Sequence, residues 1–112
     1  MNQKFEVLYH EKAVEFMDSI HSTAREKLIY NIEKSKYLLD KNIFKKLLGD
    51  IWEFRAESKG VQYRMLAFWM QLPKGRPQVV CVHGFIKKKS KVQSREIETA
   101  AIRMKQYLGD SK

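Results

Sequence analysis

The stretch that decides the fold is VVCVHGFIKKKSKVQSREIETAA, residues 79–101. Its first part is an apolar run typical of a buried strand, and its last part repeats apolar residues at helical spacing. Between them stand Lys87, Lys88, Lys89 and Lys91, so a strand from the interior of a small domain ends in a strongly positive tip. The rest of the sequence indicates what this charge is for.

The positive charge of the chain is concentrated in one segment. The formal net charge is +9. Residues 58–95 contain nine basic and no acidic residues, and the other 13 basic residues balance the 13 acidic ones. A concentrated positive field favours polyanionic partners such as nucleic acid, an anionic membrane or an acidic protein, although a solvated basic surface would have the same composition.

The N-terminal part predicts one strand followed by two helices. Residues 4–9 alternate like a short strand, and the next residues follow the i, i+3, i+4, i+7 pattern of a one-faced helix that we expect to end near residues 21–22. Ser22 or Thr23 is expected to cap the second helix. The two apolar stripes are Ala13, Phe16, Met17 and Ile20 in the first helix, and Leu28, Ile32, Ser35 and Leu39 in the second.

The C-terminal part predicts three strands, at residues 51–56, 61–70 and 78–86, and a final helix. Residues 41–50 are interpreted as the connection from the helices to the strands. The expected fold is a single α+β domain over residues 1–112 in the order β-α-α-β-β-β-α. It has a mainly antiparallel four-stranded sheet, a helical hairpin on one face and a C-terminal helix.

The first two of these strands place their polar residues on one face. With residues 57–60 as a four-residue loop, Arg55 lies opposite Gln62 and Glu53 lies opposite Arg64, and opposed residues point to the same side of a sheet. The apolar residues of both strands then share the other face, which we expect to pack on the helix pair. That apolar set is Trp52, Phe54, Tyr63 and Met65.

The third strand extends this polar face. Its alternation predicts one apolar side and one mixed side, and the mixed side joins Arg55 and Arg64 when the apolar sides lie together. The C-terminal helix is expected to cover part of the resulting cationic cleft. The apolar side is Val80, Val82, Gly84 and Ile86, and the mixed side is Cys81, His83, Phe85 and Lys87.

Such a cleft suits the binding and cleavage of RNA. Arginine forks match phosphate oxygens, Phe85 can stack on an unpaired base, and His83 can exchange a proton near neutral pH. Cleavage without metal needs a base for the 2′-hydroxyl and cations for the charged transition state. The candidate catalytic residues are Arg55, Arg64, His83 and Lys87, and the candidate RNA-binding residues are Lys45, Lys46, Phe85, Lys88, Lys89 and Lys91.

A structural role is the alternative for several of these residues. Arg64 and Glu53 would then form only a cross-strand ion pair, and His83 would be a semi-buried histidine with satisfied hydrogen bonds. Phe85 would belong to the core, and the lysines would be solvated surface.

Other classes of site fit the sequence less well. The three histidines fall in separate elements without the spacing of metal ligands, and neither a glycine-rich phosphate loop nor a Ser or Cys nucleophile signature is present. We therefore expect no metal and no cofactor. No apolar run approaches the roughly 20 residues that cross a bilayer, and the single cysteine, Cys81, cannot form an internal disulfide. These features predict a cytoplasmic protein that does not bind membranes.

Several motifs together resemble the RelE/ParE toxin superfamily, and most closely its phage-derived HigB-type branch. They are KKLLGDIWEFR (45–55), YRMLAFW (63–69), VVCVHGFIKKKSKV (79–92) and REIETAAIRMKQYL (95–108). The resemblance covers nearly the whole chain. It implies a RelE-like fold and a toxin of a type II toxin–antitoxin system that cleaves mRNA in the ribosomal A site. It also implies neutralisation by a cognate antitoxin, often a helix-turn-helix protein.

The resemblance also bears on the site. By position, Arg55, Arg64, Lys87 and Lys88 match the recurring cations of the family, whereas family members differ in the residue that acts as the base. The family often places Thr-Pro before the last helix. Val92 and Gln93 stand there in this chain, so we expect the helix to begin at Ser94 or to fray.

The leading hypothesis is thus a ribosome-dependent mRNA endoribonuclease that works through 2′-hydroxyl attack. One alternative is a ParE-like inhibitor of DNA gyrase, which would need no phosphate site. Another is a non-catalytic nucleic-acid-binding module, although the sequence has no helix-turn-helix pattern.

Overall fold

The computed structural model describes residues 2–110, apart from the side chain of Asp110, and it has the expected α+β class. Five strands form one sheet in the order β1-β5-β4-β3-β2, with β1 parallel to β5 and the other neighbours antiparallel. The elements are β1 (Glu6–Tyr9), α1 (Glu11–Ser19), α2 (Ser22–Ser35), β2 (Phe44–Leu48), β3 (Ile51–Ser58), β4 (Val61–Met70), β5 (Gln78–Lys87) and α3 (Ser94–Asp110).

The expectation of four strands is wrong, because part of the segment interpreted as a connection forms β2. This strand, FKKLL, pairs antiparallel with β3 at the edge of the sheet. It lacks the β-branched residues and the clear alternation that mark a strand in a sequence. Pairing with the apolar β3 supplies the stability that its own composition does not predict.

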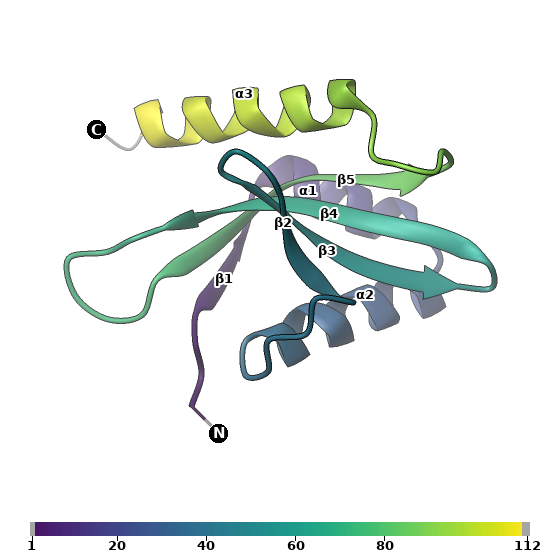
Figure 1. Ribbon diagram of the computed structural model, residues 1–112, viewed down its shortest axis with the longest axis horizontal. Helices are drawn as coiled ribbons and strands as arrows, with labels where there is room; N and C mark the ends of the chain where they lie inside the picture. The colour runs from purple at the N-terminus through teal and green to yellow at the C-terminus, as the bar shows by residue number, and fades with distance from the viewer. Residues whose placement is uncertain (1, 111–112) are drawn as a thin grey trace.

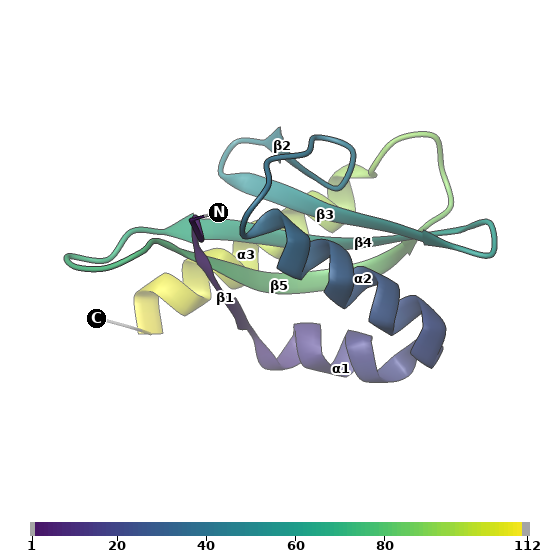
Figure 2. The same ribbon diagram turned by 90° about the horizontal axis from the view of Figure 1, so that it is seen from below.

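The sheet separates two apolar clusters (Figures 1 and 2). The larger cluster lies between the sheet and the pair α1 and α2, and it contains Phe5, Leu28, Phe54 and Met65. The smaller cluster lies under α3 and contains Leu66, Phe68, Val80 and Ala100. The predicted helical hairpin on one face and the C-terminal helix are therefore confirmed, and α3 covers the face opposite α1 and α2.

The turn between β3 and β4 is shorter than expected and shifts the register of the two strands. Ser58 pairs with Val61, so Lys59 and Gly60 alone form the loop, with φ angles of 53° and 79°. Two positive φ angles indicate a type I′ turn, whose twist matches that of the flanking strands. The register moves by two residues, an even number, so the predicted assignment of residues to faces survives.

A bulge in β5 changes which residues of that strand face α3. Leu66 pairs with His83, whereas the next residue, Ala67, pairs with Cys81, so Val82 is the extra residue. As a result Val82 and His83 both lie on the α3 side, and Val82 belongs to the cluster under that helix. The predicted grouping of Val82 with Gly84, and of Cys81 with His83, is therefore wrong. The bulge shifts the alternation by one residue.

The helix ends also differ in part from the expectations. Helix α1 ends at Ser19, and α2 begins at Ser22, so neither Ser22 nor Thr23 is its cap; His21 holds that position without a side-chain capping bond. Leu39 lies beyond the end of α2 and is exposed. Helix α3 begins at Ser94, as expected.

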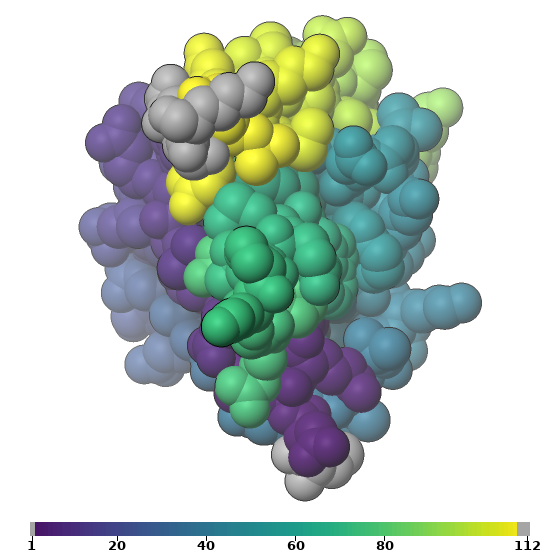
Figure 3. Space-filling view, turned by 90° about the vertical axis from the view of Figure 1, so that its left-hand side faces the viewer, coloured from purple at the N-terminus to yellow at the C-terminus, as the bar shows by residue number. Residues whose placement is uncertain are grey.

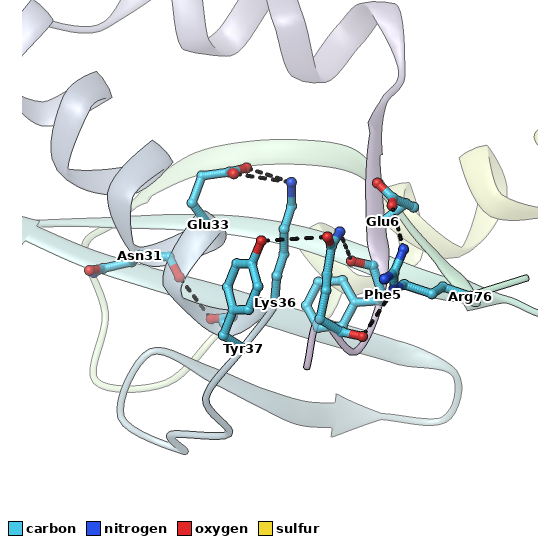
Figure 4. Close-up of polar contacts among 9 residues, drawn as sticks. Phe5, Glu6, Asn31, Glu33, Lys36, Tyr37 and Arg76 are labelled. Atoms are coloured by element: carbon cyan, nitrogen blue, oxygen red, sulfur yellow. Dashed lines mark hydrogen bonds and ion pairs between the residues drawn. The ribbon is translucent and has the colours of Figure 1, made fainter. Parts of the chain in front are cut away.

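The turn between β4 and β5 lies at the opposite end of the sheet from the lysine-rich tip of β5. It stands out beside the N-terminal segment in the space-filling view, where it is green (Figure 3). Arg76 in this turn lies 3.5 Å from a carboxylate oxygen of Glu6 and donates from Nε to the carbonyl of Gln3 at 3.1 Å (Figure 4). Arg76 therefore ties the turn to β1 and adds no charge to the β5 tip.

Candidate functional site

Four basic side chains form a row across four neighbouring strands on the α3 side of the sheet. They are Lys45 of β2, Arg55 of β3, Arg64 of β4 and Lys87 of β5. Arg55 lies directly opposite Arg64, Lys45 lies opposite Glu53, and Lys87 lies opposite Gln62. We call these four residues the cation row. The predicted convergence of Arg55, Arg64 and Lys87 is confirmed, and the unexpected strand β2 adds Lys45.

The charges of the cation row act on one another. Burial, followed by the positive charges of Arg64 and Arg55, lowers the pKa of Lys87, and the charge of Lys45 acts more weakly in the same direction. Like charges disfavour the protonated form of a lysine, whereas a bound anion would favour it. The site is therefore prepared for a negatively charged ligand, whose binding would relieve this repulsion.

Arg64 lies beneath the surface of the cation row. Its side chain is only 2% exposed, and its Nε lies 3.1 Å from Oε1 of Glu53, although the two groups are not aligned as a hydrogen bond. Its Nη1 donates to the carbonyl of Tyr63 at 3.0 Å. Burial and the charge of Arg55 lower the pKa of Arg64, and Glu53 opposes this effect.

The pairing of Arg64 with Glu53 corrects the predicted register. Glu53 lies opposite Leu66, so it reaches Arg64 diagonally across the two strands. The ion pair expected as the structural alternative exists, and it is almost completely buried. Arg64 thus contributes a buried positive charge to the row, whereas Arg55 and Lys87 are more accessible.

His83 is held by α3 through both ring nitrogens. Nε2 lies 2.9 Å from Oε1 of Glu96, and Nδ1 lies 3.2 Å from Nη1 of Arg103. Arginine can only donate, so Nδ1 accepts and the proton of the neutral ring lies on Nε2, from which it is donated to Glu96. The same Nη1 of Arg103 donates to the carbonyl of Val82 at the bulge, at 2.9 Å. This geometry matches the predicted alternative of a satisfied histidine.

Phe85 is part of the cluster under α3. Its side chain is 8% exposed, and its ring stacks on that of His83 with centroids 5.5 Å apart. Phe85 lies opposite Arg64 and so on the expected face, but its ring presents little free surface to a nucleotide base. Phe85 therefore acts as core in this structure, which is the alternative role that the sequence left open.

The lysines after β5 surround a small pocket at the start of α3. Lys88, Lys89 and Lys91 are exposed, and with Lys87, Arg95 and Glu96 they line a pocket of about 110 Å³. The pocket adjoins Lys87 and so continues the cation row beyond the edge of the sheet. A chain of phosphates following this path would meet one basic group after another.

The candidate RNA-binding residues Lys45 and Lys46 lie on opposite faces of the sheet, because adjacent residues of a strand point to opposite sides. Lys45 lies opposite Glu53, but Lys46 lies opposite Trp52, which packs with the cluster on the side of α1 and α2. Lys46 therefore lies outside the cation row, and its candidate role at this site is not supported by the geometry.

The roles of three residues at this site were not predicted from the sequence. Glu96 and Arg103 hold His83, and their spacing of seven residues on one helix was the signal that could have identified them. Asn31 of α2 donates from Nδ2 to the backbone carbonyl of Arg55 at 2.9 Å. This bond fixes the strand that carries Arg55, and nothing in the sequence predicts it.

Among residues 2–110, no group of three or more His, Cys, Asp or Glu side chains is placed to hold a metal ion. In the same part of the chain, no helix has both the length and the apolar character needed to cross a membrane.

Comparison with known proteins supplies the family. The family model described as "Phage derived protein Gp49-like (DUF891)" matches residues 15–105. No curated protein and no solved structure matches the chain. The HigB-type branch inferred from the motifs stays a prediction. The match spans most of the sequence and includes all ten candidate site residues, and the chain therefore belongs to the Gp49-like family of phage-derived proteins, within the RelE/ParE-like toxin superfamily.

Proposed function

We propose that this protein is the toxin of a type II toxin–antitoxin system and that it cleaves mRNA on the ribosome. The observation that carries this proposal is the cation row, in which four strands each contribute one basic residue to the same face: Lys45, Arg55, Arg64 and Lys87. Burial and the positive charges of its neighbours lower the pKa of Lys87. Membership in the toxin superfamily supports the same reading. Gyrase inhibition by binding alone would not require such a phosphate site.

The reaction proposed for this site is attack of a ribose 2′-oxygen of the RNA on the adjacent phosphate. The 2′-hydroxyl loses its proton and its oxygen attacks the neighbouring phosphorus, while the 5′-oxygen of the next nucleotide leaves and takes up a proton. The products are a 2′,3′-cyclic phosphate and a 5′-hydroxyl. Arg55 and Lys87 are placed to contact the phosphate oxygens, and the buried charge of Arg64 adds to their field.

The residue that accepts the first proton is not His83 in the arrangement described, because both of its ring nitrogens are already in use. Lys87 has a pKa that is lowered by burial and by its cationic neighbours, so in its protonated form it is the better-placed group to donate the proton that the leaving 5′-oxygen takes up. The candidate catalytic role of His83 stays a prediction, and to act as a base His83 would have to be released from α3.

The partner proposed for the resting state is a cognate antitoxin with an acidic segment that covers the cation row. Charge complementarity favours such a partner, because the row and the adjoining lysines include five of the nine basic residues of the segment 58–95, which has no acidic residue. A co-purified antitoxin that left Arg55 and Lys87 fully exposed would contradict this mode of inhibition.

The test is inducible expression in a bacterium with mRNA 5′ ends mapped within minutes. We expect new ends inside translated frames, which disappear when translation is blocked. Lys87→Gln should reduce cleavage by about 10²- to 10³-fold if Lys87 stabilises the transition state. The matched control is Lys74→Gln, which removes one exposed lysine from the β4–β5 turn. Growth arrest with intact mRNA would refute the proposal and favour gyrase inhibition.

A further inference from the structure

A second pocket lies on the opposite face of the sheet from the cation row. It has a volume of about 280 Å³ and lies between the start of α2 and the turn between β3 and β4. Residues of the first turn of α2 and of this hairpin both line the pocket. We call it the α2 pocket; it is lined by His21, Ser22, Thr23, Ala24, Ser58, Lys59, Val61 and Tyr63.

The start of α2 offers unused hydrogen-bond donors to this pocket. The backbone N–H of Arg25 is the first to bond within the helix, to the carbonyl of His21 at 2.9 Å. Among the described residues, the N–H groups of Ser22, Thr23 and Ala24 have no acceptor. His21 makes no side-chain cap, and the first turn contains no acidic residue. The helix N-terminus is therefore an uncompensated positive end.

An independent feature on the sheet side points to a ligand. Tyr63 is only 5% exposed and lines the pocket, yet its hydroxyl has no hydrogen-bond partner within residues 2–110. The hydroxyl is not among the side-chain atoms that are both buried and unpaired, so it lies open to the pocket, where it can bond to a partner. The surrounding protein does not supply that partner, and a ligand in the α2 pocket would.

Lys59 adds a charge at the edge of the same pocket. It occupies a position of the β3–β4 turn with φ of 53°, where Asn, Asp or Gly is preferred and a lysine is unfavourable. The turn itself thus gives no reason for a lysine there. A cationic side chain beside a helix N-terminus and a buried hydroxyl has the donor chemistry of a phosphate site.

We propose that the α2 pocket binds a phosphate group, and that this phosphate belongs to the backbone of RNA. The first part stands on the pocket alone, whereas the second part rests on the proposed function. The two sites lie at the same end of the sheet: Ser58 pairs with Val61 at the hairpin, and Gln62 beside it pairs with Lys87. An RNA strand crossing the β3–β4 hairpin would therefore place phosphates on both faces.

The test is a titration of the full chain with inorganic phosphate at constant ionic strength, followed by the backbone amide signals in NMR. We expect saturable shifts at Ser22, Thr23 and Ala24. Lys59→Asn removes the charge but suits the turn better, so a weaker affinity cannot be blamed on unfolding. Its matched control is Lys74→Asn, in the turn at the other end of the sheet, which should bind phosphate like the natural chain.

Tyr63→Phe is the sharper variant. Since the hydroxyl has no protein partner, its removal should leave the stability unchanged or slightly higher, while phosphate binding weakens about tenfold through loss of one hydrogen bond to a charged ligand. Unchanged phosphate affinity in both Tyr63→Phe and Lys59→Asn would overturn the site. So would phosphate shifts confined to the lysines after β5.

A second arm identifies the source of the phosphate. A short single-stranded RNA without terminal phosphates should shift the same α2 amides, and Lys59→Asn should reduce the slope of log affinity against log salt by about 0.7. Phosphate binding without this RNA effect would overturn the assignment to RNA. The assay needs no cleavage, so RNA binding at the α2 pocket by a chain that cuts no mRNA would refute the proposed function and leave this site standing.

Discussion

The buried pair of Arg64 and Glu53 offers the most decisive test of how the site is built. The two side chains are 2% and 4% exposed, and their charges lie 3.1 Å apart. Removing one partner leaves the other charge buried and uncompensated. Loss of one member of such a pair costs about 3–5 kcal/mol, whereas replacing both by apolar residues is often neutral or stabilising.

The experiment is a double-mutant cycle of Glu53→Leu, Arg64→Met and the double variant. We expect each single variant to lose about 3–5 kcal/mol of unfolding free energy, a large share of the roughly 5–15 kcal/mol typical of a domain. The double variant should recover most of it. Glu53→Leu should be the worse single change, because it leaves Arg64 unpaired beside Arg55, whose charge already lowers the pKa of Arg64.

The assay is urea unfolding of the purified protein and its variants, with the midpoints compared at constant slope. If the losses of unfolding free energy in the two single variants sum to the loss in the double variant within about 0.5 kcal/mol, the two side chains are not coupled and the argument is refuted. Cleavage of mRNA is then measured on the refolded double variant. We expect it to stay reduced by about 10²- to 10³-fold, since the fixed charge beneath the row is gone. Cleavage at the natural rate would mean that Arg64 serves only to neutralise Glu53.

Three further outcomes can be measured. Gly84→Ala should destabilise the chain by about 1–3 kcal/mol in thermal unfolding, because the added Cβ would overlap the ring of Phe16, which packs directly on this glycine. Arg55→Gln should raise the pKa of Lys87 in an NMR titration, since Arg55 is among the charges that lower it. His83→Ala should cost about 1–3 kcal/mol of unfolding free energy in urea, because both hydrogen bonds from the ring to α3 are lost.

Each of these outcomes has a matched control. Gly109→Ala adds the same methyl group where no heavy atom lies within 4 Å, so it should not destabilise, and an equal effect at both glycines would contradict the packing argument. Lys45→Gln should raise the pKa of Lys87 less than Arg55→Gln, because Lys45 is the weaker influence. Loss of cleavage in His83→Ala with unchanged stability would instead favour His83 as the catalytic base.

The lowered pKa of Lys87 also sets a sign for pH dependence. A lysine that is harder to protonate in the folded state binds fewer protons there than in the unfolded chain, so this residue makes stability rise as pH rises from its folded pKa toward its unfolded one. A bound phosphate has the opposite effect on Lys87, because its negative charge favours the protonated form of the lysine and so raises its pKa. RNA binding should therefore take up protons in the alkaline range, which calorimetry in two buffers of different ionisation enthalpy would measure.

Local pattern was sufficient to predict the class of fold and the side of the sheet on which the arginines lie. Alternation has a period of two, so Arg55 and Arg64 stay on one face even though the true register differs by two residues from the expected one. The choice between a two-residue and a four-residue turn depends on whether Lys59 accepts a positive φ, and composition does not decide that. Strand β2 was missed because its stability comes from pairing with β3.

Only tertiary contacts could decide the roles of the individual side chains. The bulge in β5 is invisible in the sequence, because Val80, Cys81 and Val82 are all apolar and either face would accept them. Partners of His83 come from residues 13 and 20 positions away, on a helix whose docking orients them. The burial of Arg64 and the open hydroxyl of Tyr63 likewise depend on how helices close over the sheet, since exposure and hydrogen bonding belong to the packed molecule and are set by no single segment.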